Sequence, residues 1–158
     1  MSAVGYRTRP DPDSRAITAG DFAPLHQRFG FTIDAAASDE NARLPRHWTE
    51  SDDALRQSWA GERVWANPPW SHPNLERWVV KGHLEAGGAG LIVMLMPANR
   101  TGQGFWQRHV EPYRDRPGSG LRVEFLPGRI QFLLPGQAGI GPRERSPFGC
   151  CLLIWGAP

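Results

Sequence analysis

Apolar residues along this chain occur in two kinds of segment that follow one another. In one kind they form a continuous run, and in the other they are spaced three or four residues apart. Short continuous runs predict buried strands, and spaced sets predict helices with one apolar face. The predicted strands cover residues 31–34, 64–66, 91–96, 121–126, 130–134 and 148–155. The predicted helices cover residues 16–29, 73–86 and 102–110. This alternation is typical of an α/β domain, and the wholly apolar run at 91–96 is typical of a central parallel strand.

The predicted helices have defined apolar faces and end signals. Asp21 is a candidate N-cap for the helix over 16–29, Thr18 is a second candidate, and Gly30 is a natural stop. The apolar face of this helix consists of Phe22, Leu25 and Phe29. The apolar face predicted for residues 73–86 consists of Leu75, Trp78, Val79 and Leu84. Both faces are expected to pack against the sheet.

Length and composition predict one globular domain. The chain has 158 residues, 40% of them hydrophobic, which suits a single domain with a sizeable core. Residues 1–15 are polar with little periodicity and predict a mobile tail, so the domain is expected to cover 16–158. No apolar run reaches the roughly 18 residues of a membrane span, and the N-terminus lacks the apolar core of a signal peptide. A soluble cytoplasmic protein is expected.

The cysteine and histidine patterns argue against a disulfide framework and a metal site. Cys150 and Cys151 are adjacent in an apolar run, where neighbouring strand residues point to opposite faces. They are expected to be buried, unpaired thiols in a reducing compartment. The five histidines are scattered without a ligand pattern, so no metal is expected.

Positive charge is concentrated in the last third of the chain. The net charge is only +2, but residues 100–158 carry 8 basic residues against 4 acidic ones. A basic region of this kind favours a nucleic-acid partner. The alternative is a bias of composition, because 17 of the 18 basic residues are arginine and glycine and proline are abundant.

The most distinctive stretch is Asn67-Pro68-Pro69-Trp70, which follows the strand predicted over 64–66. The prolines hold Asn67 and Pro68 extended and leave an amide side chain and bare carbonyls facing outward. In open α/β sheets the carboxyl ends of the strands are where ligands bind. The structural alternative is a proline turn that ends a strand, with Trp70 in the core.

This tetrapeptide resembles the Asn/Asp-Pro-Pro-aromatic motif of S-adenosylmethionine-dependent amino-group methyltransferases. The chain from about residue 18 to residue 155 resembles the small DNA N6-adenine methyltransferase family of bacteriophages and prophages. The blocks that carry this resemblance are residues 31–37, 67–70, a Trp-Val-Val-Lys helix, 95–100 and 125–130. It implies an abbreviated Rossmann-like methyltransferase fold, with a mostly parallel sheet and an antiparallel C-terminal strand. The abbreviation falls on residues 39–61, which are too few for two further strands and helices.

The resemblance assigns the catalytic positions to Asn67, Pro68, Pro69 and Trp70. The Asn67 side-chain oxygen and the Pro68 carbonyl would accept hydrogen bonds from an exocyclic amine, which favours a tetrahedral nitrogen as it attacks a methyl group. Trp70 would stack on a base taken out of the helix. The implied cofactor is S-adenosylmethionine, and the implied partner is DNA.

The resemblance also places a set of residues near the cofactor: Thr18, Asp34, Ala35, Asp52, Asp53 and Asn67. Several of them have a structural alternative. Thr18 is also an N-cap candidate, and Asp34 is also a candidate cap for an exposed turn. Asp52 and Asp53 also suit the start of a short helix over 50–55. Alanines follow Asp34, where most methyltransferases have glycines.

Candidate contacts to substrate or phosphate lie beside the turn and in the basic loops: Ser71, Asn99, Arg100, Arg129, Arg143 and Arg145. Loops 100–118 and 136–147 would read the target, since the chain has no room for a separate recognition domain. The first functional hypothesis is methylation of adenine N6 in DNA. The alternatives are methylation of another planar amine (cytosine N4, RNA guanine N2 or a protein glutamine) and a non-enzymatic descendant that binds nucleic acid.

Overall fold

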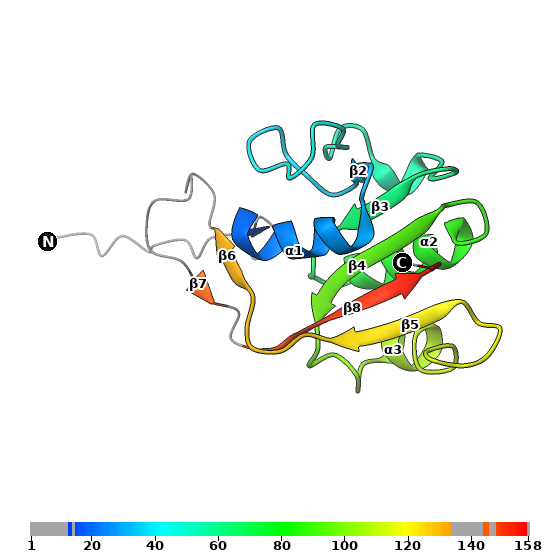
Figure 1. The fold of residues 1–158 in the computed structure, drawn as a ribbon. Coiled ribbons are helices and arrows are strands. Elements are labelled where there is room, and N and C mark those ends of the chain that lie inside the picture. The colour runs from blue at the N-terminus through cyan, green and yellow to red at the C-terminus, as the bar shows by residue number, and fades with distance from the viewer. Residues whose placement is uncertain (1–12, 14, 134–143, 146–147, 158) are drawn as a thin grey trace, which may run out of the picture.

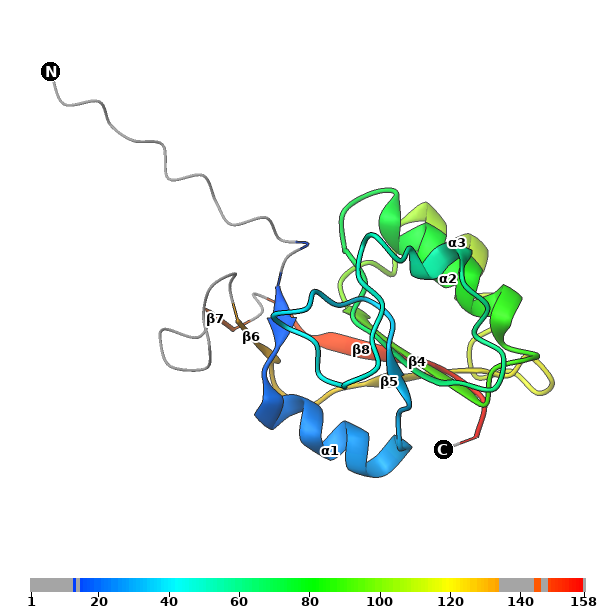
Figure 2. The ribbon, with the colours of Figure 1, turned by 90° about the horizontal axis from the view of Figure 1, so that it is seen from above.

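The centre of the molecule is a five-stranded sheet in the order β2-β3-β4-β8-β5. The strands are β2 (Ile33–Asp34), β3 (Arg63–Ala66), β4 (Leu91–Pro97), β8 (Cys150–Trp155) and β5 (Leu121–Phe125). Helix α1 (Ala19–Phe29) covers one face of this sheet, and α2 (Asn74–Glu85) and α3 (Gly104–His109) cover the other (Figure 1, Figure 2). This computed structural model describes residues 13, 15–133, 144–145 and 148–157. The α/β class predicted from the sequence is confirmed.

The strand directions bring several loops to one edge of the sheet. Strands β2, β3 and β4 are parallel, and β8 is antiparallel to both β4 and β5. Strand β5 therefore runs in the same direction as β4, so the carboxyl ends of β2, β3, β4 and β5 share one edge. This is the mostly parallel sheet with an antiparallel C-terminal strand that the family resemblance implies. In open α/β sheets, ligands bind at this carboxyl edge.

A second, small sheet lies beyond the carboxyl edge, where the arrowheads of β4 and β5 point in Figure 1. It joins β1 (Ala16–Ile17), β6 (Gln131–Leu133) and β7 (Glu144–Arg145) by antiparallel pairs. The sequence predicts a helix from residue 16, but β1 pairs with β6 instead. That partner lies far along the chain, so no local pattern indicates the pairing.

Helix α1 begins at Ala19, because its N-cap is Thr18 rather than the predicted Asp21. The Thr18 hydroxyl accepts a hydrogen bond from the Asp21 backbone N–H at 3.2 Å. The Asp21 carboxylate instead accepts a bond from the Gln131 N–H of β6 at 2.9 Å. Gly30 ends the helix as predicted, in the left-handed conformation with φ at 62°.

The buried face of α2 differs from the prediction at one position. Its buried residues are Leu75, Trp78, Val79 and Gly82. Leu84 is 77% exposed, so its assignment to the apolar face is wrong. With about 3.6 residues per turn, Leu84 lies on the opposite side of the helix from Leu75. Gly82 lies on the buried side and faces the ring of Trp155.

Residues 35–62, all of which the structure describes, contain no strand. A single isolated parallel bridge, between Asp34 and His47, pairs this stretch with β2. The short helix expected over 50–55 is replaced by a 3-10 helix, η2 (Ala54–Arg56). The abbreviated half of the sheet, predicted from the length of this stretch, is confirmed.

The central strands supply most of the core. Every residue of β4 and β8 is buried. The largest fully buried side chains include four tryptophans from separate parts of the chain: Trp59, Trp65, Trp106 and Trp155. Cys150 and Cys151 are buried thiols, as predicted, and burial raises the pKa of Cys151 to about 12. No helix in the described part of the chain is long and apolar enough to cross a membrane.

Two glycine-to-alanine substitutions test the packing of α2 on the sheet. An alanine at position 82 would place its methyl group 2.6 Å from the ring of Trp155. That ring is buried and donates an indole hydrogen bond to His83, so it cannot easily move. Gly82→Ala should lower the free energy of unfolding, measured in urea, by about 1–3 kcal/mol.

The matched control is Gly20→Ala, because Gly20 lies in α1 with open space around it. This change should raise the free energy of unfolding by roughly 0.4–1 kcal/mol, since alanine restricts the unfolded chain. A Gly82→Ala protein as stable as the wild type would contradict the close packing of α2 on Trp155.

Candidate active site

The turn over residues 67–70 leaves the end of β3 at the carboxyl edge of the sheet. The nitrogens of Pro68 and Pro69 carry no hydrogen, so this part of the turn has no backbone donor. Pro68 is buried, and Asn67 is half-buried. The turn therefore offers carbonyl acceptors and one side-chain amide at the edge where ligands bind.

The side chain of Asn67 has a fixed orientation. Its Nδ2 donates a hydrogen bond to the backbone carbonyl of Arg15 at 3.2 Å. Within the described residues its Oδ1 receives no hydrogen bond, and the side chain lies on the wall of a pocket. An amide that is held through its nitrogen presents its oxygen as an unused acceptor.

The pocket beside Asn67 lies between β1, the ends of β2 and β3, and the loop over residues 38–45. It is lined by Arg15, Ala16, Ile17, Asp34, Ala36, Asn41, Arg43, Trp65 and Asn67. These residues come from four separate stretches of sequence. The parallel pairing of β2 with β3 brings two of those stretches together.

Asp34 is a buried carboxylate on the pocket wall, with only 3% of its surface exposed. Its Oδ2 accepts a hydrogen bond from the Arg43 N–H at 3.0 Å, and its Oδ1 accepts a longer one from the Ala36 N–H at 3.4 Å. Burial raises the pKa of Asp34, and the two N–H groups and the charges of His47 and Arg43 only partly oppose that rise. A buried carboxylate of this kind favours a cationic ligand group.

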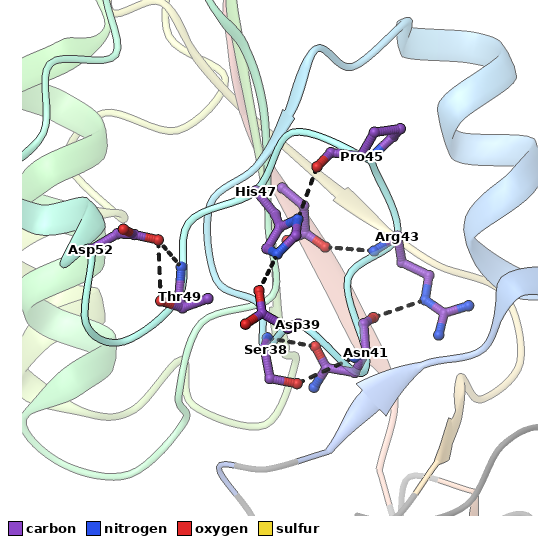
Figure 3. A network of polar contacts seen from close by, with 9 residues as sticks. Ser38, Asp39, Asn41, Arg43, Pro45, His47, Thr49 and Asp52 are labelled. Atoms are coloured by element: carbon purple, nitrogen blue, oxygen red, sulfur yellow. Dashed lines mark hydrogen bonds and ion pairs between the residues drawn. The ribbon is translucent and has the colours of Figure 1, made fainter.

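Arg43 and Asn41 bring hydrogen-bond donors to the same pocket. The Nε of Arg43 donates to the Asn41 carbonyl at 3.2 Å, and Figure 3 shows its guanidinium pointing away from His47. Within the described residues its two terminal nitrogens have no hydrogen-bond partner. Asn41 and Ser38 bond reciprocally, each side chain to the other's backbone N–H, at 2.8 and 3.2 Å. The pocket thus holds both charge signs, a set that complements a zwitterion.

The loop around His47 closes on itself through polar contacts (Figure 3). One ring nitrogen of His47 contacts the Asp39 carboxylate at 2.8 Å, and the other contacts the Pro45 carbonyl at 3.0 Å. Both nitrogens can donate only when the ring is protonated. The contacts therefore raise the pKa of His47, with Asp39 the main cause. The loop that takes the place of the missing strands is stabilised by this charged pair.

Trp70 is 8% exposed and belongs to an aromatic cluster. Its ring meets the Phe132 ring edge-on, with 5.3 Å between centroids, and the Phe148 ring at 6.0 Å. Phe132 belongs to β6, so the small sheet packs on the turn. Among the described residues the buried indole N–H of Trp70 has no acceptor. In this conformation Trp70 occupies a largely buried position.

Two of the residues expected near the cofactor, Asp34 and Asn67, line the pocket. Ala35 is buried beside the lining residue Ala36, and Thr18 follows the lining residue Ile17 and caps α1. Neither Ala35 nor Thr18 lines the pocket itself. The N-cap alternative for Thr18 is therefore correct as far as the helix is concerned.

Asp52 and Asp53 lie outside the pocket. Asp52 accepts hydrogen bonds from the N–H of Thr49 at 2.8 Å and from its hydroxyl at 3.1 Å (Figure 3). Asp53 precedes η2 but makes no capping bond through its side chain. Neither residue therefore caps the short helix in the way that the sequence predicts.

The residues expected to contact the substrate are dispersed along the carboxyl edge. Asn99 is exposed and Arg100 half-buried just after β4, and Arg129 is exposed between β5 and β6. The Ser71 hydroxyl donates to Asp13 and accepts from Asn74, so it is engaged within the protein. Arg143 and the side chain of Arg145 lie outside the described residues.

Sequence reasoning missed most of the pocket wall: Arg15, Ala16, Ile17, Ala36, Asn41, Arg43 and Trp65. The spacing of Ser38 and Asn41, which suits a reciprocal turn, was the one available signal for the loop. Arg15 falls in the stretch expected to be a tail, where nothing local marks it. Among the described residues, no three His, Cys, Asp or Glu side chains come together as metal ligands.

A comparison with solved structures identifies the class of fold. The chain matches a crystal structure from Pyrococcus horikoshii, described as a candidate RNA methyltransferase, with a TM-score of 0.53. The match covers 87% of this chain and 82% of that chain. The sequences are 11% identical, so the likeness concerns the fold alone. The protein has a Rossmann-like methyltransferase fold.

The family follows from the sequence as a whole. Residues 13–157 match the family described as DNA N-6-adenine-methyltransferase (Dam), and the chain belongs to this family. A DNA N-6-adenine-methyltransferase of Escherichia phage T1 is 33% identical to it over 81 residues. That alignment covers 50% of this chain and 33% of the phage protein, so the chain matches about a third of that relative's length. Methyltransferases of this kind use a methyl donor of the S-adenosylmethionine type.

The pair of His47 and Asp39 predicts a pH-dependent contribution to stability. The folded protein raises the pKa of His47 above its unfolded value. The pair therefore stabilises the fold fully below that unfolded value, about 6.5, and the stabilisation is lost as the pH rises through the folded pKa. Asp39→Asn should lower the pKa of His47 in an NMR titration of the ring. Its cost in unfolding free energy should shrink as the pH rises.

Glu40→Gln is the matched control, because it neutralises the neighbouring acid, which makes no contact with His47 among the described residues. The His47 titration should be the same in this variant as in the wild type. If Asp39→Asn left the titration of His47 unaltered, the pairing would be contradicted.

Proposed function

We propose that this chain is a DNA adenine-N6 methyltransferase that uses S-adenosylmethionine. The observation that carries the proposal is the open acceptor Oδ1 of Asn67, which shares a pocket with the buried carboxylate of Asp34 at the carboxyl edge of the sheet. Membership in the DNA N-6-adenine-methyltransferase family supports adenine in DNA as the methyl acceptor.

Asn67 and Pro68 are the groups proposed to act on the amine of the base. This amine is a weak nucleophile, because its lone pair is delocalised into the adenine ring. The Asn67 Oδ1 and the Pro68 carbonyl accept hydrogen bonds from its two N–H groups, which favours a tetrahedral nitrogen. When bound, S-adenosylmethionine would supply a methyl group on a sulfonium sulfur, which would leave as a neutral thioether when the amine nitrogen takes the methyl group. The methylated nitrogen then loses its extra proton to water.

Asp34 and Arg43 are the proposed partners of the cofactor's amino-acid end. The carboxylate of Asp34 suits the ammonium group, and a cation there would offset the burial that raises the pKa of Asp34. The guanidinium of Arg43 suits the carboxylate group, since it can donate two parallel hydrogen bonds. Thr18 and Ala35 are also proposed to lie near this end of the cofactor, and the support is their position next to the lining residues Ile17 and Ala36.

The adenosine half of the cofactor is proposed to lie toward Asp52 and Asp53. The parallel bridge between Asp34 and His47 directs the chain after His47 toward the carboxyl edge, where a second strand would otherwise end. Acidic residues at that position suit hydroxyl groups of a ribose. The support for this placement is the direction of the chain after His47, because neither Asp52 nor Asp53 lines the pocket.

Trp70 is proposed to stack on the flipped base, which requires one face of its ring to become uncovered. Its ring is 8% exposed and packs against Phe132 and Phe148. Stacking on an aromatic face needs that face to be uncovered, so base binding must separate Trp70 from one of these rings. Pro69 restricts the backbone of the turn and so fixes the direction in which the Trp70 side chain leaves it.

Basic and amide residues along the carboxyl edge are proposed to meet DNA. Asn99, Arg100 and Arg129 follow strands that end at this edge. Arg143 and Arg145 belong to the same basic third of the chain. Arginine contacts to phosphates would supply binding affinity that decreases as the salt concentration rises. They would not read the DNA sequence.

Methyl transfer from labelled S-adenosylmethionine to unmethylated genomic DNA tests the proposed reaction. Nucleoside analysis of the digested DNA should show the label in N6-methyladenine. Asn67→Ala removes an acceptor needed as the amine becomes tetrahedral, so kcat should fall by about 100-fold or more. Cofactor binding, measured by calorimetry, should change little. The control is Gln27→Ala, which removes an exposed amide on α1, outside the pocket and outside the loops expected to meet DNA.

Label in N4-methylcytosine would keep the mechanism but contradict adenine as the acceptor. Wild-type turnover in Asn67→Ala would contradict the role of Asn67. A wild-type protein that binds no S-adenosylmethionine would contradict the proposed function as a whole.

Decarboxylated S-adenosylmethionine tests the proposed role of Arg43. The wild type should bind the complete cofactor more tightly than this analogue by roughly tenfold or more, since a hydrogen bond to a charged group contributes about 1.5–3 kcal/mol. Arg43→Ala should remove most of this difference. Arg46→Ala is the matched control, because Arg46 lies in the same loop but pairs with Glu62 outside the pocket. If Arg43→Ala discriminated between the two ligands as well as the wild type, Arg43 would not bind the carboxylate.

A further inference from the structure

Residues that precede β1 hold the turn after β3. The Oδ1 of Asp13 accepts hydrogen bonds from the N–H groups of Trp70 at 2.8 Å and of Ser71 at 2.9 Å. Its Oδ2 accepts a further bond from the Ser71 hydroxyl. One carboxylate therefore binds three donors that lie directly after the two prolines.

These donors need an acceptor because of the turn's own chemistry. Pro68 and Pro69 end the sheet ladder, and Trp70 and Ser71 carry the first backbone N–H groups that follow them. Both N–H groups are partly buried. A buried N–H without a partner costs free energy comparable to a lost hydrogen bond. Asp13 supplies the partner from a distant part of the chain.

The backbone carbonyl of Arg15 acts on the other end of the same turn. It accepts a hydrogen bond from the Asn67 Nδ2 at 3.2 Å. A carbonyl can accept but not donate, so it selects the nitrogen of the amide and turns the oxygen away. The oxygen is the atom proposed to accept from the substrate amine, and the side chain lies on the pocket wall.

We propose that Asp13 and the carbonyl of Arg15 position the catalytic turn: Asp13 holds residues 70 and 71, and the Arg15 carbonyl directs the Asn67 oxygen into the pocket. Neither group touches the reacting atoms, so both are positioning groups. The inference rests on the proposed function, which makes Asn67 Oδ1 a catalytic acceptor. It assigns a role to residues that the sequence pattern predicts to be a mobile tail.

The proposal also explains why position 67 holds asparagine in this chain. The motif that residues 67–70 resemble allows aspartate at its first position, and an aspartate oxygen accepts from an amine equally well. An aspartate at position 67 would face the Arg15 carbonyl with an oxygen in place of the donor Nδ2, at a separation of 3.2 Å in the wild type. Two acceptors cannot form that bond, so the side chain would lose its orientation.

The main experiment compares Asp13→Ala with Asp13→Asn in the full chain. Asp13→Ala should lower kcat by about 10- to 100-fold, because small misplacements of a reacting group are costly, and should leave the Kd of S-adenosylmethionine little changed. Asp13→Asn should restore most of the turnover. Its Oδ1 can accept from both N–H groups, and its Nδ2 can donate to the Ser71 hydroxyl.

Glu62→Ala is the matched control for stability. Glu62 lies next to the opposite end of β3 and also binds three donors, two from Arg46 and one from Thr32. Its loss should lower the unfolding free energy without lowering kcat. A fall in kcat in Asp13→Ala but not in Glu62→Ala would separate positioning from general destabilisation.

Amide hydrogen exchange gives a reading that needs neither DNA nor turnover. In the wild type the N–H groups of Trp70 and Ser71 should both exchange slowly, and Asp13→Asn should keep that protection. Rapid exchange at either N–H in the wild type would overturn the proposal, even if Asp13→Ala failed to fold. So would wild-type kcat in Asp13→Ala, or turnover in Asp13→Asn as low as in Asp13→Ala.

Asn67→Asp tests the contribution of the Arg15 carbonyl. This variant should bind the cofactor but lose most of its turnover, and turnover like that of the wild type would overturn this part of the proposal. If the wild type itself transferred no methyl group to DNA, the proposed function would fail. The exchange measurement would then decide by itself whether Asp13 holds the turn.

Discussion

Two consecutive prolines at the end of β3 are the constraint on which the rest of the site depends. They remove two backbone donors, so the chain cannot extend the ladder of β3, and they hold Asn67 and Pro68 extended. The N–H groups that follow require an acceptor, and the carboxylate of Asp13 provides it. The Asn67 amide requires one as well and takes the carbonyl of Arg15. Both ends of the turn are therefore tied to residues near the start of the described chain.

The abbreviated half of the sheet transfers part of the pocket from strands to a loop. No strand forms over residues 35–62, and the pocket wall there consists of Asn41 and Arg43. The loop keeps its shape through the bridge of His47 with Asp34 and the charged pair of His47 with Asp39. A strand would hold the same wall by a ladder of backbone bonds. This half of the pocket depends instead on a few backbone bonds around the bridge and on side-chain contacts, and one of the side-chain contacts changes with pH.

The small sheet joins the beginning of the domain to its basic end. Strand β1 leads from the residues that hold the turn, and its partner β6 places Phe132 against Trp70. The same strand β6 donates a backbone bond to Asp21 of α1. A movement that separates Trp70 from Phe132 therefore has to disturb packing that links α1, β1 and β6.

The sequence by itself determined the α/β class, the central strand at 91–96, the stop at Gly30 and the proline turn. These features depend on local rules: apolar runs, the freedom of glycine and the fixed φ of proline. Only the tertiary structure decided that β1 pairs with β6 and that Asp13 caps a turn 57 residues later. The sequence does not distinguish an aspartate that is exposed to solvent from one that, like Asp13, binds a distant turn. They differ only in which N–H groups the folded backbone brings within hydrogen-bond distance.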